Sequence, residues 1–134
     1  MTVYVLGIGS NINAEFQCRQ MIAALELRFG QLRVSELVTT KAVGLAAPDY
    51  INAVVCFESD ISAEALRQWC KRLEEQLGRD RQQRLCAADI DLLLAVDRPA
   101  LAVEKLINQV KEPWFRPLVT ELLNINEGVD SVYH

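Results

Sequence analysis

Two aspartates separated by one residue are the sharpest chemical feature of the sequence. Asp89 and Asp91 stand directly before the apolar residues 92–96, a pattern typical of a buried β-strand. Side chains two apart on a strand point to the same side, so the two carboxylates should lie side by side. Because like charges repel, a divalent cation such as Mg²⁺ would offset them. The alternative is the solvated end of a strand, with Arg79 or Arg84 nearby.

Three arginines precede this acid pair. Arg79, Arg81 and Arg84 lie in a polar segment that begins after Gly78. Guanidinium groups match phosphate oxygens bidentately. A metal-binding acid pair beside several arginines is what transfer of a phosphoryl or diphosphoryl group requires, because both neutralise the charge of a polyphosphate. Solvated surface arginines are the alternative interpretation.

A second pair of side chains, Tyr50 and Asn52, is also two residues apart, in the apolar run 50–58. An asparagine in such a strand needs hydrogen-bond partners when it is buried. Its amide either orders the loop 39–48 or reads the edge of a planar, amide-like heterocycle. The residues leave both interpretations open.

Strands and helices must position these groups. Apolar runs and partial alternation predict strands over 3–8, 32–38, 50–58 and 89–96, and an ordered loop over 39–49. Helical spacing predicts one helix capped by Asn13 and closed at Gly30, and another capped by Ser62 and closed at Gly78. The order β-α-β-β-α-β favours an α+β, ferredoxin-like fold, with both helices packed on one face of an antiparallel sheet.

The length of 134 residues fits a single domain, 1–134. We expect a core over 2–96, a less regular helical segment over 100–123 and a frayed tail over 126–134. Within the segment, 113–123 has the spacing of a helix, with Trp114, Leu118 and Leu122 on one face.

Composition excludes several classes of protein. A net charge of -4 disfavours general nucleic-acid binding, which depends on many phosphate contacts. No apolar run approaches the roughly 20 residues of a membrane span, and the start lacks a basic leader. The 4 scattered cysteines and 1 histidine make no zinc motif and fit a reducing compartment. We expect a cytoplasmic monomer that binds neither nucleic acid nor membrane.

Four blocks of the sequence resemble the 6-hydroxymethyl-7,8-dihydropterin pyrophosphokinase family. They are Gly-Ile-Gly-Ser-Asn at 7–11, Pro-Asp-Tyr-Ile-Asn-Ala-Val-Val at 48–55, the segment from Leu-Glu at 73–74 to Gly-Arg-Asp-Arg at 78–81, and Asp-Ile-Asp-Leu-Leu at 89–93. Their order and spacing carry the resemblance, which covers about residues 2–96 and continues weakly to about 123.

The resemblance implies transfer of diphosphate from ATP to the hydroxymethyl group of a reduced pterin, giving AMP, in folate biosynthesis. It implies two Mg²⁺ ions with ATP, held by Asp89 and Asp91, with Arg79 and Arg81 also catalytic. The implied pterin-binding residues are Thr40, Val43, Gly44, Tyr50, Asn52 and Trp114. The implied nucleotide-binding residues are Lys71, Glu74, Arg79, Arg81, Arg84 and Lys111.

The sequence also departs from the family pattern. The Trp-Gly-Pro-Arg stretch of the family is replaced by the shorter 84–88, and its Pro-His pair by Asn108 and Gln109. Three hypotheses follow: an active pyrophosphokinase, a catalytically weakened relative that binds a pterin or nucleotide as a regulatory or partner-binding module, and a ferredoxin-like interaction domain.

Overall fold

The apolar run at the start of the chain forms the central strand of an antiparallel sheet. In this computed structural model the described residues are 1–41, 48–80, 82, 85–97 and 107–123. Strand β1 (Thr2–Ser10) pairs with β4 (Tyr50–Ser59) on one side and with β5 (Asp89–Asp97) on the other. The strand order is β2-β4-β1-β5, where β2 is Arg33–Val34, and β3 (Val38–Thr40) also pairs with β4. The predicted ferredoxin-like α+β fold is confirmed, with β4 an inner strand.

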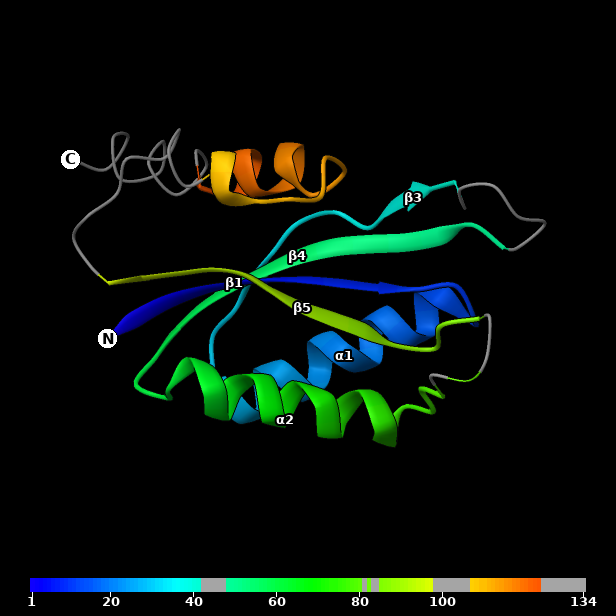
Figure 1. The fold of residues 1–134 in the computed structure, drawn as a ribbon, viewed down its shortest axis with the longest axis horizontal. Coiled ribbons are helices and arrows are strands. Elements are labelled where there is room, and N and C mark those ends of the chain that lie inside the picture. The colour runs from blue at the N-terminus through cyan, green and yellow to red at the C-terminus, as the bar shows by residue number, and fades with distance from the viewer. Residues whose placement is uncertain (42–47, 81, 83–84, 98–106, 124–134) are drawn as a thin grey trace.

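Two helices cover one face of the sheet, as predicted (Figure 1). α1 (Ala14–Phe29) and α2 (Ala63–Gln76) pack against every second residue of β1, represented by Leu6 and Ile8. This alternation follows from the two-residue period of a strand. The first core therefore lies between the sheet and this helical layer.

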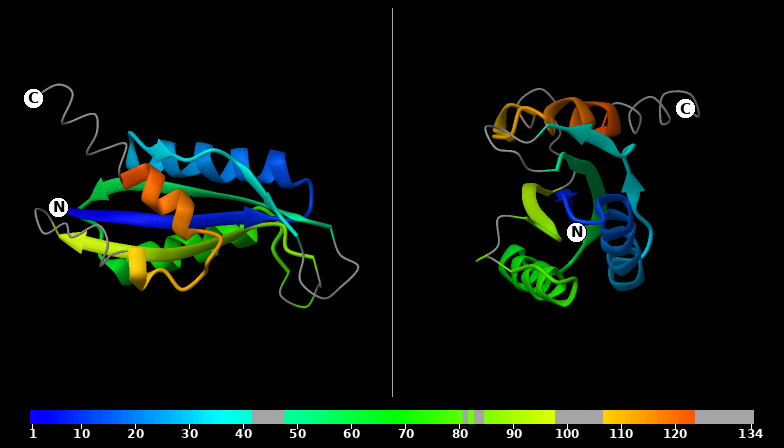
Figure 2. Two further views of the ribbon diagram at one scale, coloured as in Figure 1. Left: turned by 90° about the horizontal axis from the view of Figure 1, so that it is seen from above. Right: turned by 90° about the vertical axis from the view of Figure 1, so that its right-hand side faces the viewer.

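The opposite face of the sheet is also covered (Figure 2). Val3 and Val5 of β1 pack with Leu118 and Val119 of a helix over 116–123. The predicted helix over 113–123 thus begins later, because 113–115 form a turn. Its buried face also differs from the prediction: Trp114 is 49% exposed, whereas the neighbouring Phe115 is buried.

Helix ends follow the predicted signals with one exception. The Ser62 hydroxyl accepts a hydrogen bond from the Ala65 N–H at 3.1 Å, and Gly30 and Gly78 have φ of 86° and 94°. Asn13 stands at the start of α1, but it adopts φ 46° and its side chain makes no capping hydrogen bond. The predicted side-chain cap at Asn13 is therefore wrong.

The predicted strand over 32–38 is interrupted. β2 ends at Val34, and the Oγ of the next residue, Ser35, accepts from the Val54 N–H at 2.8 Å. A side-chain hydroxyl that takes a backbone donor competes with regular pairing. Pairing resumes at β3 (Val38–Thr40), which occupies the start of the predicted loop 39–49; residues 42–47 lie outside the described part.

β5 differs from the buried strand that we predicted. Among the described strands it pairs only with β1, so it is an edge strand, and of residues 89–91 only Ile90 is buried. A register shift opposite Val5 and Leu6 leaves Leu93 as an extra residue, a β-bulge. No helix among the described residues is long and apolar enough to cross a membrane.

Candidate active site

The acid pair faces the side of the sheet opposite α1 and α2. Asp89 and Asp91 lie directly across from Gly9 and Gly7 of β1, while Ile90 between them belongs to the core under the helices. Because alternate residues of a strand face opposite sides, both carboxylates point away from that core. The prediction that they lie side by side is consistent with this register.

The second pair of side chains shares this face and this end of the sheet. Asn52 lies across from Gly9 on β4, so Asn52, Gly9 and Asp89 form one cross-strand row. Residues directly opposite on antiparallel strands share a face. The sheet therefore brings together the amide and the acid pair, which are far apart in sequence.

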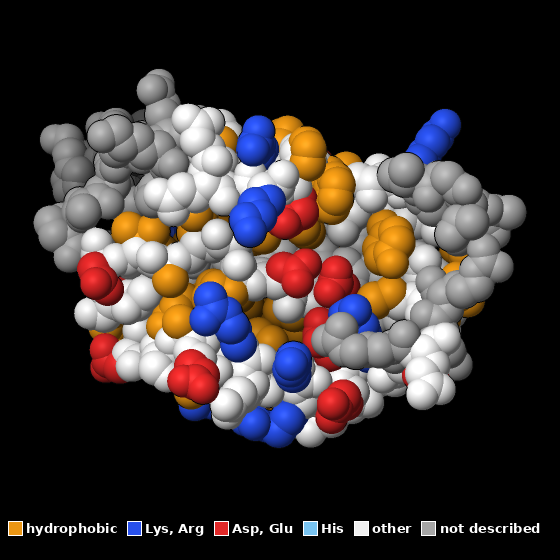
Figure 3. Space-filling view, in the orientation of Figure 1, with side chains coloured by type: hydrophobic (Ala, Val, Ile, Leu, Met, Phe, Trp, Pro, Cys, Tyr) orange, Lys and Arg blue, Asp and Glu red, His pale blue; other side chains and the backbone are white. Residues whose placement is uncertain are grey.

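A cleft of about 500 Å³ runs around the outer edge of β5. Its walls come from α2, from the segment before β5 and from residues 109–112. It is lined by the acids Glu74, Asp89, Asp91 and Glu112 and by the bases Arg67, Lys71, Arg79 and Lys111. Figure 3 shows acidic side chains at the centre of this surface with basic side chains around them.

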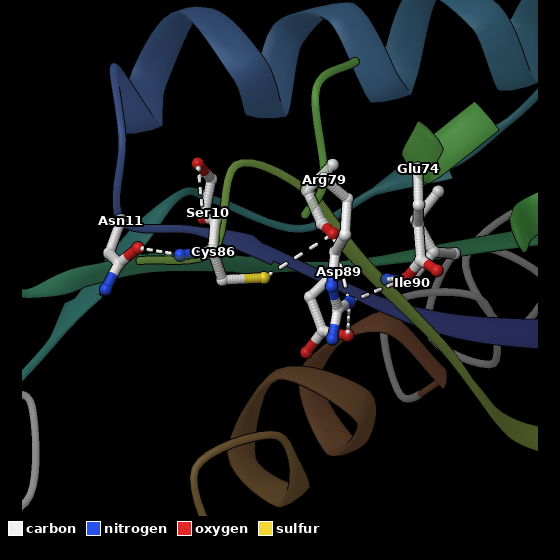
Figure 4. A network of polar contacts seen from close by, with 8 residues as sticks. Ser10, Asn11, Glu74, Arg79, Cys86, Asp89 and Ile90 are labelled. Atoms are coloured by element: carbon white, nitrogen blue, oxygen red, sulfur yellow. Dashed lines mark hydrogen bonds and ion pairs between the residues drawn. The ribbon is translucent and has the colours of Figure 1, made fainter. Parts of the chain in front are cut away.

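Arg79 links the acid pair to α2 (Figure 4). Its Nη1 donates to Asp89 Oδ1 at 2.9 Å, to Glu74 Oε2 at 3.1 Å and to the Ala88 carbonyl at 3.0 Å. The same Glu74 oxygen accepts from the Ile90 N–H at 2.7 Å, at the outer edge of β5. Burial opposes the charge of Arg79, but its contacts with Asp89 and Glu74 raise its pKa overall.

The electrostatics of the cleft favour a cation at the acid pair. Burial raises the pKa of Asp91 to about 6, and the charges of Asp89, Glu112 and Glu74 add to this effect. A divalent ion would relieve this repulsion. Among the described residues no group of three or more His, Cys, Asp or Glu side chains could hold a metal. Two carboxylates completed by substrate phosphates are the kind of site that suits Mg²⁺.

The polar side chains on β3 and β4 are held together. Asn52 Nδ2 donates to Thr40 Oγ1 at 2.6 Å, and Asn52 is only 6% exposed. This bond fits the interpretation that Asn52 orders the chain after β3. Burial raises the pKa of Tyr50, and the nearby Cys86 and Asp89 add to this effect.

Comparison with known proteins decides the family. Residues 5–120 match the family model for 7,8-dihydro-6-hydroxymethylpterin-pyrophosphokinase. The chain belongs to this family. It is 34% identical over 103 residues to a 2-amino-4-hydroxy-6-hydroxymethyldihydropteridine pyrophosphokinase of Haemophilus influenzae. That match covers 70% of this chain and 62% of the relative, so the chain spans less than two thirds of the relative's length.

Several residues that the pyrophosphokinase resemblance implied are found at the cleft, and others are not. Lys71 and Lys111 line it together with Glu74 and Arg79. Its lining residues do not include the implied pterin-binding residues Thr40, Tyr50, Asn52 and Trp114. The predictions for Val43, Gly44, Arg81 and Arg84 lie outside the described residues.

Sequence reasoning missed two charged residues of the cleft, Arg67 and Glu112. A signal for Arg67 was present, since Arg67, Lys71 and Glu74 have the i, i+4, i+7 spacing of one helix face. No comparable signal existed for Glu112, because residues 107–112 lack regular periodicity. Its Oε2 atom is buried and has no hydrogen-bond partner among the described residues.

Proposed function

We propose that this protein transfers diphosphate from ATP to 6-hydroxymethyl-7,8-dihydropterin, giving AMP, as a step of folate biosynthesis. Membership of the pyrophosphokinase family supports this proposal. The observation that carries it is the cross-strand row of Asn52, Gly9 and Asp89, which joins an amide suited to a heterocycle to acids suited to a metal-bound polyphosphate.

In this proposal the nucleotide occupies the cleft beside β5. Asp89 and Asp91 would hold Mg²⁺, with two ions expected with ATP, and the metal would neutralise charge on the triphosphate. Arg79 and Arg81 act with them on the transferred group. The remaining proposed nucleotide contacts are Lys71, Glu74, Arg84 and Lys111.

The pterin lies at the end of β4 in this proposal. The Asn52 amide would read the heterocycle edge and Tyr50 would pack beside its ring, with Thr40, Val43, Gly44 and Trp114 completing the site. The hydroxymethyl oxygen forms a bond to the β-phosphorus of ATP and loses its proton to solvent, while the bond from that phosphorus to the oxygen bridging the α- and β-phosphates breaks, so AMP leaves. Holding both substrates in one orientation removes much of the entropic barrier.

A second function is favoured by two features that differ from an active pyrophosphokinase site. Asn108 and Gln109 replace the family's Pro-His pair, and Arg79 is already engaged by Glu74 and Asp89. Each charge-assisted phosphate contact contributes about 1.5–3 kcal/mol, so losing two or three at the transition state slows transfer by orders of magnitude. The second candidate is therefore a relative that binds pterin or nucleotide as a regulatory or partner-binding module.

The deciding experiment mixes the protein with Mg²⁺, ATP and 6-hydroxymethyl-7,8-dihydropterin and measures AMP by chromatography. AMP in excess over protein, dependent on the pterin and absent in Asp91→Ala, supports the first function. Tight binding of either ligand without AMP supports the second. If the protein neither binds the two ligands nor forms AMP, the remaining hypothesis is an interaction domain.

We further propose that residues 1–134 act as one domain and as a monomer, without nucleic-acid or membrane partners. The cytoplasm is the proposed compartment, because it supplies ATP and keeps thiols reduced. The cysteines of the described part are all free, which is consistent with that setting.

A further inference from the structure

The end of β1 contacts both halves of the proposed site. β1 lies between β4, which carries Asn52, and β5, which carries Asp89. Its last residues belong to the Gly-Ile-Gly-Ser-Asn block at 7–11, for which neither the sequence chemistry nor the proposed function supplies a role.

Gly9 determines where the Asn52 amide lies. A Cβ atom at Gly9 would stand 2.5 Å from Asn52 Oδ1, well inside the contact distance of the two atoms. The other end of the amide is fixed by its bond to Thr40 at 2.6 Å. The amide is thus held between β1 and β3, and a side chain at position 9 would force it to move.

Asn11 fixes the segment that leads into β5 (Figure 4). Its Oδ1 accepts from the Cys86 N–H at 2.6 Å, and its own N–H donates to the Cys86 carbonyl at 2.9 Å. Ser10 Oγ donates to the same carbonyl at 3.3 Å. Asn11 is 5% exposed and Ser10 is fully buried, so these bonds are shielded from water and costly to lose.

The hydrogen bonds between Asn11 and Cys86 also affect the position of Asp89. Cys86 is followed within two residues by Ala88, whose carbonyl accepts from Arg79, and then by Asp89, which pairs with Arg79. Freeing Cys86 would therefore loosen the backbone that orients Arg79 and Asp89 at the cleft.

We propose that Gly9 and Asn11 are positioning residues that serve different substrates. Gly9 positions the Asn52 amide for the heterocycle, and Asn11 positions the start of β5 for the Mg²⁺-bound triphosphate. The assignment of each substrate to its half-site rests on the proposed function. That Gly9 acts on Asn52 and Asn11 acts on Cys86 follows from their contacts alone, whatever the substrates are.

The test measures both affinities by calorimetry on three variants. Gly9→Ala should weaken pterin binding about tenfold, the order of one hydrogen bond, and change Mg²⁺-ATP binding less than about twofold. Asn11→Ala should show the reverse pattern. The control is Asn13→Gly, because Asn13 is exposed, makes no capping bond and has a φ that glycine accepts; it should change neither affinity.

Two further measurements do not depend on ligand identity. In Asn11→Ala, amide hydrogen exchange at Cys86 and Ile90 should become faster, while Gly9→Ala leaves both protected. In a double-mutant cycle read by thermal unfolding, Gly9→Ala should cost much less stability when Asn52 is already alanine, because the clash is then gone.

The outcomes separate this inference from the proposed function. If the wild type binds both ligands but each variant weakens both equally, the positioning roles are refuted and the function stands. If the wild type binds neither ligand, the function fails. The exchange and unfolding measurements then still test whether Asn11 holds Cys86 and whether Gly9 makes room for Asn52. Unchanged amide exchange in Asn11→Ala, together with additive stability losses in the Gly9→Ala and Asn52→Ala cycle, overturns the inference.

Discussion

At the scale of single residues, Arg79 shows how one side chain fits two interpretations. We predicted a phosphate ligand, and the alternative was a partner for the acid pair. Its guanidinium contacts Glu74 and Asp89 and also lines the cleft. An arginine has several donors in a fixed fork, so contact with the acids and contact with a phosphate are compatible in one position.

Asp91→Ala should abolish Mg²⁺-dependent ATP binding and leave the fold intact. Among the described residues Asp91 makes no ion pair of the kind that joins Asp89 to Arg79, and it lines the cleft, so removing it costs metal coordination rather than packing. Calorimetry with ATP and Mg²⁺ measures the loss. The matched control is Asp97→Ala on the same strand, because the Asp97 side chain accepts a hydrogen bond from Thr2 at the far end of β5. Unchanged ATP affinity in Asp91→Ala would refute the metal assignment.

Asn52→Ala should weaken pterin binding more than ATP binding, because its amide lies at the heterocycle end of the row. Thr40→Val, which removes the internal acceptor of the same amide, separates the two roles proposed for Asn52. A pterin-reading amide predicts a smaller loss in Thr40→Val than in Asn52→Ala. If both variants lost affinity for pterin and for ATP to the same extent, Asn52 would have a purely structural role.

At the scale of elements, the link between α2 and β5 controls the geometry of the site. Glu74 is 4% exposed and bonds both the Ile90 N–H of β5 and Arg79. A helix that presents a buried carboxylate to the outer edge of a strand satisfies a donor that would otherwise be unpaired. The resemblance implied a nucleotide contact for Glu74, and its burial adds a structural role.

Glu74→Ala should destabilise the protein by about 2–4 kcal/mol, because it leaves the Ile90 N–H without its acceptor and removes one of the two carboxylates that pair with the partly buried Arg79. Chemical denaturation followed by circular dichroism measures the free energy of unfolding. Glu75→Ala changes the neighbouring exposed residue and should shift it by less than about 0.5 kcal/mol. Similar small losses in both variants would contradict the structural role.

At the scale of the whole molecule, two cores lie on the two faces of the sheet, and the first contains thiols. Burial raises the pKa of Cys18 to about 11. Burial, with smaller contributions from Glu74 and Asp91, raises that of Cys70 to about 12. Ionising either thiol in the folded state would place a charge in an apolar core, which is costly.

The free energy of unfolding should fall as pH rises above about 9, where thiols ionise in the unfolded chain but not in the folded one. Below that pH both states keep the proton and the thiols contribute no pH dependence. Cys70→Ala should reduce the slope between pH 9 and 11, measured by denaturation at several pH values. An unchanged slope would mean that Cys70 ionises in the folded state, and so is not shielded in this core.

The sequence by itself determined the strands β1, β4 and β5, the helices α1 and α2 and the ferredoxin-like order, because local periodicity specifies which residues are buried. It also predicted the acid pair, since two-residue spacing on a strand is a local property. It did not predict the break at Ser35 or the burial of Phe115 in place of Trp114, because both depend on partners distant in sequence, Val54 and the sheet face.

Only the tertiary structure decided how the pieces of the site meet. No local pattern reveals that Gly9 faces Asn52 and Asp89 at once, or that Asn11 holds Cys86, 75 residues away. Such contacts are set by strand register, which the whole sheet and both cores fix together. The sequence therefore predicted the chemistry of each side chain, whereas the tertiary structure determined which side chains lie next to one another.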